Sequence, residues 1–473
     1  MVVGDVSTQT DVLVIGAGPG GYVAAIRAAQ HGREVTLVER DALGGTCLNY
    51  GCIPSKALIT GADIADRARE AENLGISADI QVDLEQMVDW KDGVVGKLTG
   101  GVEALCKQHG ITIMEGLAVF ADDSSVRLIH EGQGEGAETI EFDQAIVATG
   151  SRPLEVPGFD FSEEHINDSR QLLDLDTIPD ELVVIGAGYI GMELSTAFSK
   201  LGADVTVVEM LDDILPGYES DIARPVKQRA EEHGVDFHFG HAADGYEESD
   251  DGVVVHTETE DGETASFPAD EVLVAVGREP VTDTVEVDAA GIETDDDGFI
   301  PTDEHCRTDV DDIYAIGDVA GEPMLAHKAM YEGKIAAEVI AGEPAGLDAR
   351  AVPAVVFTDP EIATVGMTET EATEAGYETV VGQTSLRSNG RSLTLDEDQG
   401  TVRVVADATH ETVLGAQLVA PEASELVGEL ALAVEVGATL TDVAGTIHTH
   451  PTLSEAVAEA VENALGEAIH TVN

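Results

Sequence analysis

Two segments of this chain repeat the same glycine-rich pattern, and the repeat constrains the fold more strongly than any other feature. Residues 12–21 read as a short apolar run followed by Gly-Ala-Gly-Pro-Gly-Gly, and residues 182–191 read as a second apolar run followed by Gly-Ala-Gly-Tyr-Ile-Gly. In each copy an acid stands 21 residues after the central glycine, at Glu39 and at Glu209. Strand, glycine turn, helix and acid in this order predict a dinucleotide-binding βαβ unit, and two copies are far stronger evidence than one.

Each glycine of the pattern has a physical role. The first permits a tight turn, the second lets the backbone approach a pyrophosphate, and the third lets helix and strand pack closely. The N-terminus of the helix, whose alanine-rich body is expected at residues 22–30 in the first copy, faces the anion. In chain order the glycines are Gly16, Gly18 and Gly21, then Gly186, Gly188 and Gly191.

The two acids bear on which nucleotides bind. Glu39 and Glu209 would each accept hydrogen bonds from a ribose. A carboxylate at position 209 would bond a free 2′-hydroxyl and repel a 2′-phosphate, and Met210 follows it where an arginine could have held that phosphate. We therefore expect NAD rather than NADP at the second unit.

A pair of cysteines, Cys47 and Cys52, stands five positions apart in a glycine-rich segment just after the first unit. Such a pair can open and close a disulfide with little backbone movement. A structural disulfide is unusual for a chain with 4 cysteines in 473 residues, and a structural zinc site would need a second close pair of ligands. Cys106 and Cys306 are isolated and are expected to be buried as small hydrophobic side chains.

The pair beside a nucleotide site predicts redox chemistry. A dithiol exchanges two electrons readily with a flavin, so one nucleotide should be a flavin and the other the nicotinamide carrier. We expect no metal.

The charge of the chain is extreme, with 92 acidic against 24 basic residues and a net charge of −68. The acids are scattered along the sequence rather than gathered in a tail, so self-repulsion should destabilise the fold in low salt. Molar salt screens that repulsion to within a few ångströms, which favours the cytoplasm of an extreme halophile. The same charge disfavours nucleic acid and anionic membranes. Residues 1–11 show no secretory signal and no apolar stretch could span a bilayer, so we expect a soluble cytoplasmic protein.

These motifs together resemble the flavoprotein disulfide reductases (class I pyridine nucleotide-disulfide oxidoreductases), most closely their dihydrolipoamide dehydrogenase branch. The resemblance runs nearly end to end. Besides the two fingerprints and the cysteine segment at residues 44–56, it includes residues 148–153, 276–280, 314–318 and 448–455.

The resemblance implies an α/β fold with two Rossmann-like domains, for FAD and NAD, and a C-terminal α+β dimerisation domain. The expected boundaries are 1–151 for the FAD domain with the dithiol, 152–277 for the NAD domain, 278–346 for a central domain completing the FAD site, and 347–473 for the dimer interface. It also implies a homodimer.

It further implies the residues at each cofactor. For FAD these are Gly16, Gly18, Gly21, Glu39, Arg40, Gly45, Thr46, Lys56, Ala118, Thr149, Gly150, Asp318 and Ala326; for NAD they are Gly186, Gly188, Tyr189, Ile190, Gly191, Glu209, Gly277 and Arg278. Asp318 matches the carboxylate that holds the flavin ribityl chain. The family often has glycine where Ala118 stands. Tyr189 is either an aromatic gate over the flavin or an exposed turn residue.

The expected catalytic residues are Cys47, Cys52, His450, Glu455, Lys56 and Glu193. A His-x-His pair alone is more often structural or metal-binding, but the family motif makes His450 the base that deprotonates dihydrolipoamide, with Glu455 orienting it and His448 in support. Lys56 and Glu193 would form an ion pair beside the flavin. By the same resemblance Cys47 is attacked by the substrate, Cys52 passes electrons to FAD, and FAD reduces NAD⁺. His450 and Glu455 would come from the other subunit.

Several rivals share parts of this pattern. A glutathione-type reductase is disfavoured by Glu209 and by residues 53–58, a mercuric reductase by the lack of cysteines at 468–473, and a soluble transhydrogenase by the presence of Cys47. A flavoprotein subunit that binds partner enzymes without turnover is disfavoured by the complete catalytic set. The substrate would be free dihydrolipoamide or a lipoyl group on another protein.

Overall fold

The first sheet of the molecule is built around the first glycine fingerprint. The computed structural model describes residues 7–130, 138–249 and 252–471. Strands β1 (Ser7–Ile15), β2 (Val35–Glu39), β3 (Thr112–Glu115) and β6 (Glu138–Val147) run parallel, in the order β3-β2-β1-β6. The antiparallel strands β5 (Ser125–Ile129) and β4 (Leu117–Asp122) extend the sheet beyond β6. The apolar run at 12–15 lies at its buried centre, as a parallel strand covered on both faces requires.

A late segment of the chain completes this sheet. Strand β17 (Ile313–Ala315) pairs in parallel with β6, so that Ala315 lies opposite Val147. Helix α8 (Ala326–Ile340) follows and packs on α1 (Pro19–Gln30), the helix of the first fingerprint. Residues from the expected central domain therefore lie against the first nucleotide unit. The domain boundaries themselves stay predictions.

Helix α1 begins at Pro19, three residues before the stretch expected from its alanines. Proline is favoured in the first helical turn because its missing N–H would be unpaired there in any case. Gly18 is the residue before the helix and has extended backbone dihedrals.

The second fingerprint lies in a separate parallel sheet, ordered β11-β10-β9-β15-β8. Its strands are β8 (Ile166–Asn167), β9 (Glu181–Ile185), β10 (Asp204–Glu209), β11 (Asp236–Phe239) and β15 (Glu271–Val274). Helices α6 (Tyr189–Leu201) and α7 (Ser220–Glu232) belong to this unit, and an antiparallel sheet of β12 (His241–Ser249), β13 (Gly252–Thr259) and β14 (Thr264–Ala269) projects from it.

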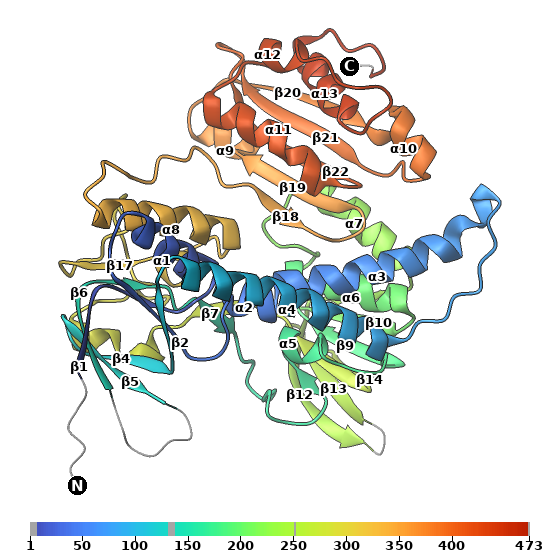
Figure 1. The fold of residues 1–473 in the computed structure, drawn as a ribbon. Helices are drawn as coiled ribbons and strands as arrows, with labels where there is room; N and C mark the ends of the chain where they lie inside the picture. The colour runs from blue at the N-terminus through green and yellow to red at the C-terminus, as the bar shows by residue number, and fades with distance from the viewer. Residues whose placement is uncertain (1–6, 131–137, 250–251, 472–473) are drawn as a thin grey trace.

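The C-terminal part is an α+β unit with its own antiparallel sheet, ordered β18-β19-β22-β21-β20. The strands are β18 (Ala354–Val356), β19 (Glu361–Gly366), β20 (Thr379–Ser385), β21 (Thr401–Asp407) and β22 (Val413–Ala420). Helices α11 (Ala423–Val436) and α13 (Glu455–Leu465) pack on the sheet (Figure 1). The predicted fold class is confirmed: two Rossmann-like units and a C-terminal α+β domain.

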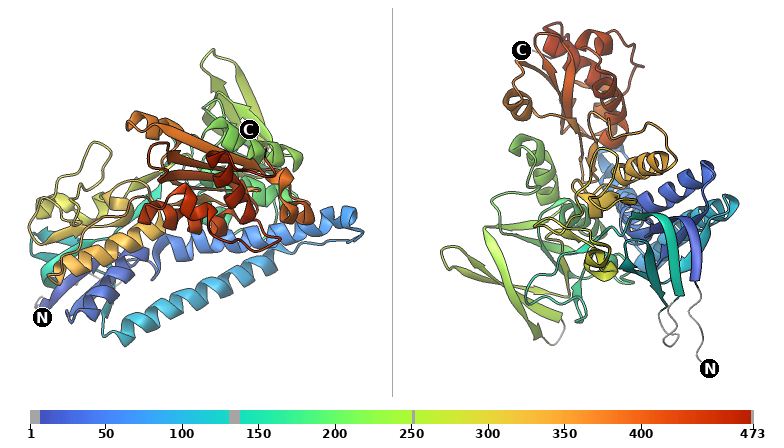
Figure 2. Two further views of the ribbon diagram at one scale, coloured as in Figure 1. Left: turned by 90° about the horizontal axis from the view of Figure 1, so that it is seen from above. Right: turned by 90° about the vertical axis from the view of Figure 1, so that its left-hand side faces the viewer.

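Two long helices run side by side along one flank of the molecule, α3 (Cys52–Glu70) and α4 (Leu84–Gln108) (Figure 2). Helix α3 also packs on α6 and so joins the first half of the chain to the second fingerprint. Within the described ranges, no helix is both long enough and apolar enough to cross a membrane. The N-terminal stretch considered for a secretory signal and the end considered for extra cysteines lie partly outside those ranges.

Candidate active site

A cavity of about 400 Å³ lies between the first glycine turn, the cysteine pair and the start of α6. It is walled by the turn at residues 16–20, by residues 45–56 and by residues 148–153. Residues 316–318 after β17 and Ala326 at the start of α8 add a further side. Stretches far apart in the sequence therefore meet around one space.

Nearly all residues expected to bind FAD line this cavity. They are Gly16, Gly18, Glu39, Arg40, Gly45, Thr46, Lys56, Ala118, Thr149, Gly150, Asp318 and Ala326. Gly21 lies behind the wall: a Cβ there would stand 1.9 Å from the carbonyl oxygen of Gly16, so only glycine lets helix and turn pack this closely.

The cavity fits a dinucleotide at the position where the fingerprint predicts one. A Cβ at Gly18 would meet no protein atom within 4 Å, so the bare backbone there faces open space on the cavity wall. Glu39 lies at the end of β2, and its Oε2 accepts a hydrogen bond of 2.6 Å from the Ala17 N–H. The acid is thus held beside the turn, where a ribose would be.

The second unit repeats this local geometry outside the cavity. Glu209 Oε2 accepts a hydrogen bond of 2.7 Å from the Ala187 N–H, and a Cβ at Gly191 would stand 2.0 Å from the Gly186 carbonyl oxygen. Of the residues expected at NAD, only Tyr189, Ile190 and Arg278 line the cavity. The structure describes the other residues expected at NAD as well, and they do not line the cavity: Gly186, Gly188, Gly191, Glu209 and Gly277.

The cysteine pair lies at the junction of two helices. Cys47 is in the short helix α2 (Gly45–Asn49), and Cys52 is the first residue of α3. Both are free thiols and line the cavity. Gly45 lets α2 approach the nucleotide turn, because a Cβ there would stand 2.6 Å from the Gly18 Cα.

The pKa values of the two thiols are shifted in opposite directions. A hydrogen bond with Cys47 lowers the pKa of Cys52 to about 7; burial opposes this shift and the nearby charge of Lys56 supports it. The same hydrogen bond and burial raise the pKa of Cys47. The pair titrates as one unit, and its first proton leaves from Cys52. Near neutral pH a large share of the reduced pairs therefore carries a thiolate, the form able to donate electrons.

Lys56 and Glu193 form an ion pair at the cavity, with 2.6 Å between Lys56 Nζ and Glu193 Oε2. Lys56 is one turn after Cys52 on α3, and Glu193 is on α6. The Phe357 N–H donates to the other carboxylate oxygen at 2.9 Å, and the Phe357 ring lies 4.6 Å from Lys56 Nζ. The buried carboxylate thus has a partner at each oxygen.

His450 and Glu455 lie together but away from this cavity. His450 Nδ1 is 2.9 Å from Glu455 Oε1, while the His450 side chain is 80% exposed. Within the described part of the chain, neither residue is in the cavity lining. His448 makes a different pair, 3.0 Å from Glu429 Oε2.

Ser151 is a site residue that the sequence reasoning missed. Its hydroxyl donates to Asp318 Oδ2 at 2.6 Å and accepts from Arg278 Nε at 2.8 Å. A single serine therefore joins the carboxylate expected at the ribityl chain to an arginine from the end of the second unit. Its place in the segment 148–153, directly after Gly150, was the available signal.

Glu332 was missed as well. From α8 its Oε2 accepts a hydrogen bond of 2.7 Å from the Gly317 N–H, which holds the turn before Asp318. The side chain is buried and pairs with Lys328 at 2.9 Å. A glutamate within an alanine-rich stretch was its only sequence signal. Cys106 and Cys306 are buried, as predicted.

Comparison with known proteins agrees with this geometry. Residues 10–333 match the family model described as pyridine nucleotide-disulphide oxidoreductase, and residues 352–461 match the dimerisation domain of the same family. The second match falls on the C-terminal α+β unit.

Curated relatives match over the full length of both chains. A dihydrolipoyl dehydrogenase of Haloferax volcanii is 64% identical, one of Halobacterium salinarum is 63% identical and one of Bacillus subtilis is 49% identical, each with 100% of both chains covered. The first two sources are halophilic archaea, in keeping with the acidic composition.

Solved structures show the same fold. LpdA from Mycobacterium tuberculosis superposes with a TM-score of 0.88 at 30% identity, covering 96% of this chain and 99% of that one. The HOCl-induced flavoprotein disulfide reductase RclA from Escherichia coli gives a TM-score of 0.85 at 27% identity, with the same coverage. The resemblance inferred from sequence is confirmed, and the chain belongs to the pyridine nucleotide-disulphide oxidoreductase family, among its dihydrolipoyl dehydrogenases.

Proposed function

We propose that this protein oxidises dihydrolipoamide to lipoamide and reduces NAD⁺ to NADH. The observation that carries the proposal is the free Cys47–Cys52 pair on the wall of the nucleotide cavity, in a chain 64% identical from end to end to a dihydrolipoyl dehydrogenase. In its disulfide form a cysteine pair placed there can take two electrons from a substrate dithiol by thiol–disulfide exchange, and the resulting dithiol can deliver them to a bound nucleotide.

The cavity residues would hold FAD, and the second fingerprint would bind NAD⁺. Gly18 leaves room for the pyrophosphate, Glu39 would bond the adenosine ribose, and Asp318 would bond the ribityl chain. When bound, FAD supplies the two-electron step that links the dithiol to hydride transfer to NAD⁺. Glu209 would select NAD⁺ over NADP⁺ through its carboxylate.

The dithiol exchange begins from the oxidised pair. One substrate thiol gives its proton to His450, and its sulfur attacks Cys47, which breaks the Cys47–Cys52 bond and leaves a thiolate on Cys52. The second substrate sulfur displaces Cys47 and closes the lipoamide ring. Of the two substrate protons, one stays with Cys47 and His450 and the other is released to water. The low pKa of Cys52 suits it as the leaving sulfur.

The base must reach the dithiol from a second subunit. In one chain His450 is exposed and outside the cavity lining of the described residues, while Glu455 is placed to orient its ring. Burial alone would raise the pKa of Glu455, but hydrogen bonds from the Thr452 N–H and His450 together lower that pKa, so Glu455 stays a carboxylate. A homodimer formed through residues 352–461 would bring His450 of one chain to Cys47 of the other.

The surroundings follow from charge. A net charge of −68 suits a cytoplasm with molar salt, and the lipoyl group would arrive free or on another protein.

The test is NAD⁺ reduction by dihydrolipoamide in molar KCl, with the visible spectrum of the protein recorded in parallel. We expect turnover together with a flavin spectrum. A flavin spectrum without turnover on dihydrolipoamide would contradict the substrate and leave glutathione as the next disulfide to try. Protein without flavin after purification and FAD addition would contradict the assignment of the cavity.

A further inference from the structure

Two ion pairs with the same sequence offset connect helices α3 and α6. Lys56 pairs with Glu193 at 2.6 Å, and seven residues further along both helices Asp63 pairs with Lys200 at 2.8 Å. Seven residues are about two helical turns, so both pairs lie on the same contact line. The helices therefore run parallel, and the second pair, with its charges reversed, matches the register of the first.

One short segment of the C-terminal domain contacts both pairs. The Phe357 N–H donates to Glu193, and two residues later Asp359 Oδ2 lies 2.6 Å from Lys200 Nζ. Lys200 thus bridges two carboxylates, one from α3 and one from this segment. Three parts of the chain surround the Lys56–Glu193 pair: α3, α6 and this segment. Lys200 lies on α6 and forms ion pairs with the other two.

Burial makes these charges dependent on each other. The side chain of Lys200 is 4% exposed and that of Glu193 is 5% exposed. A buried charge that loses its partner is strongly destabilising, so removing Lys200 would leave Asp63 and Asp359 to repel each other. Movement of α3 or of the segment at 357–359 would reduce this repulsion between the two carboxylates.

Further charges surround Asp359. Arg229 Nε lies 3.4 Å and His233 Nε2 3.6 Å from its Oδ2. Burial alone would raise the pKa of Asp359, but His233 and the charges of Lys200 and Arg229 hold that pKa well below its usual range. The carboxylate is therefore ionised and available to Lys200.

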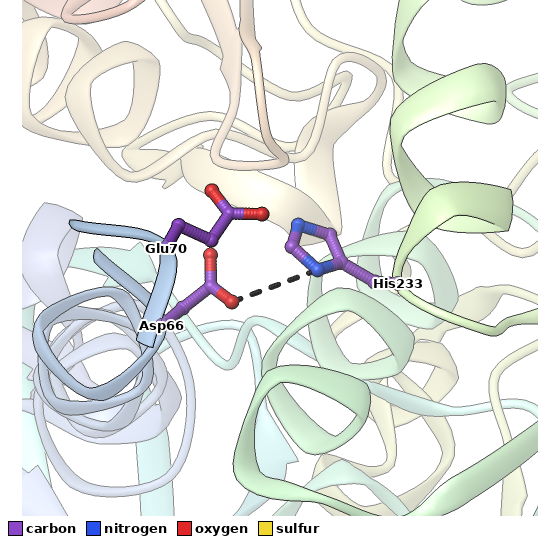
Figure 3. Close-up of side chains that lie close together, drawn as sticks. All are labelled: Asp66, Glu70 and His233. Carbon is purple, nitrogen blue, oxygen red and sulfur yellow. Dashed lines mark ion pairs between the residues drawn. The ribbon is translucent and has the colours of Figure 1, made fainter. Parts of the chain in front are cut away.

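Three residues at and near the end of α3 are of the types that bind metal ions, but an arginine side chain already supplies their positive charge. Asp66 and Glu70 point toward His233, with ligand atoms within 4.8 Å of one another (Figure 3). Arg229 lies 2.7 Å from Glu70 and 3.8 Å from Asp66. The guanidinium supplies the positive charge, so the group belongs to the ion-pair network of α3.

We propose that Lys200 is a positioning residue, which holds α3 in register with α6 through Asp63 and Asp359 and thereby keeps Lys56 and Glu193 in place beside the dithiol. The proposal rests on the proposed function only in giving that pair a role at the flavin. Lys200 itself touches neither the cavity nor the cysteines among the described residues. Its effect on the dithiol is transmitted through the Lys56 charge.

The test is the pH dependence of iodoacetamide alkylation of the reduced dithiol in the holoenzyme, with the Cys47 and Cys52 peptides quantified by mass spectrometry. Lys200→Met should raise the midpoint for the pair by about half a pH unit, or roughly twofold less alkylation at pH 7, because Lys56 no longer stabilises the thiolate as well. Lys200→Arg, which keeps the charge, should restore the wild-type midpoint.

Lys91→Met is the matched control. Lys91 is also buried, with its side chain 2% exposed, but its Nζ contacts Asp174 and the Leu173 carbonyl instead. Its midpoint should equal that of the wild type. If Lys200→Met does not fold, Asp63→Asn removes one partner of Lys200 and should shift the midpoint in the same direction.

A folded Lys200→Met or Asp63→Asn variant with the wild-type midpoint would overturn the proposal, as would an equal shift in Lys91→Met. The readout needs no lipoamide turnover. A failure of the proposed substrate therefore leaves this result interpretable, and the two hypotheses can fail separately.

Discussion

The two glycine fingerprints of this protein have the same local structure and different surroundings. In both, an acid at the end of the second strand accepts a hydrogen bond from the glycine turn, at 2.6 Å for Glu39 and 2.7 Å for Glu209. In both, the third glycine lies against the carbonyl of the first. The glycines and the acid that the two fingerprints share, at the same spacing, thus produce the same local geometry.

The surroundings differ because different segments pack on each turn. The first turn is met by α2 through Gly45, by residues 148–153 and by the segment before Asp318, and together they enclose the cavity. The second turn contributes only its first helical residues, Tyr189 and Ile190, to that cavity. A turn on the cavity wall suits a resident cofactor, whereas a turn outside that cavity suits a carrier that must leave after each turnover. The motif alone does not distinguish these uses.

The largest expected effect is a loss of turnover without a loss of FAD. It would distinguish the role of the dithiol from that of the two nucleotide units. Cys47→Ser should lower turnover of dihydrolipoamide by at least about 10³-fold, because no sulfur remains for the substrate to attack. FAD should stay bound, since Gly18 and Glu39 are unchanged. Steady-state NADH production and the visible spectrum measure the two separately; turnover near the wild-type rate would remove Cys47 from the mechanism.

A matched pair of substitutions tests the first turn, which lines the cavity, against the second turn, which lies mostly outside its lining. Gly18 and Gly188 have φ of −64° and −70°, values open to any residue, and an added Cβ meets no protein atom closer than 4.0 Å. Valine should therefore leave the fold intact and exclude the pyrophosphate, weakening binding by about tenfold or more.

The two variants should fail differently. Gly18→Val should be purified with little FAD, whereas Gly188→Val should keep FAD and show a raised KM for NAD⁺. Flavin content per chain and the NAD⁺ dependence of the rate are the measurements. Loss of FAD from both variants would break the assignment of one nucleotide to each unit.

Glu209→Arg tests the assignment of NAD⁺, rather than NADP⁺, to the second nucleotide unit. The change removes the partner of a 2′-hydroxyl and adds one for a 2′-phosphate, so the preference for NAD⁺ over NADP⁺ should fall by about tenfold. The ratio of kcat/KM for the two carriers is the measurement. Glu39→Gln is the control in the first nucleotide unit and should leave the kcat/KM ratio unchanged. An unchanged ratio in Glu209→Arg would contradict the role of Glu209 at the ribose.

The last prediction concerns the pH dependence of the unmodified dithiol and involves no substitution. Because the folded pKa of Cys52 is about 7, below that of an ordinary thiol, the reduced pair should gain thiolate as the pH rises through 7 and lose it about tenfold per unit below. Burial raises the pKa of Cys306 to about 12, so this thiol should not react over the same range. Alkylation rates of each cysteine peptide between pH 5 and about 9 would show both. A dithiol midpoint near that of a free thiol would contradict the assigned acidity.

Much of the site could be predicted from sequence because the motifs are local. Gly16 and Gly18 are separated from Glu39 by one βαβ unit, and backbone geometry alone brings them together. Cys52 and Lys56 are one helical turn apart on α3, so their proximity follows from the helix. The fold class followed in the same way from the duplicated unit.

Residues that depend on packing between distant segments could not be found by spacing. Ser151 joins Arg278 to Asp318, three positions spread over 168 residues, and Glu332 reaches the Gly317 N–H from another helix. A serine or a glutamate in such places has no local pattern, since its partners are chosen by how the sheets and helices pack. The Asp63–Lys200–Asp359 bridge was absent from the sequence reasoning for the same reason.

The sequence by itself determined the two nucleotide turns, the acids that face them, the redox pair and the high negative charge, because each depends on residue type and short spacing. Only the tertiary structure decided that the first turn lines the cavity while most of the second lies outside its lining, that Ser151 joins Asp318 to Arg278, and that Lys200 bridges Asp63 and Asp359. Hydrogen bonds and turns form between neighbours along the chain, whereas enclosure and ion pairing of buried charges form only where distant segments pack together.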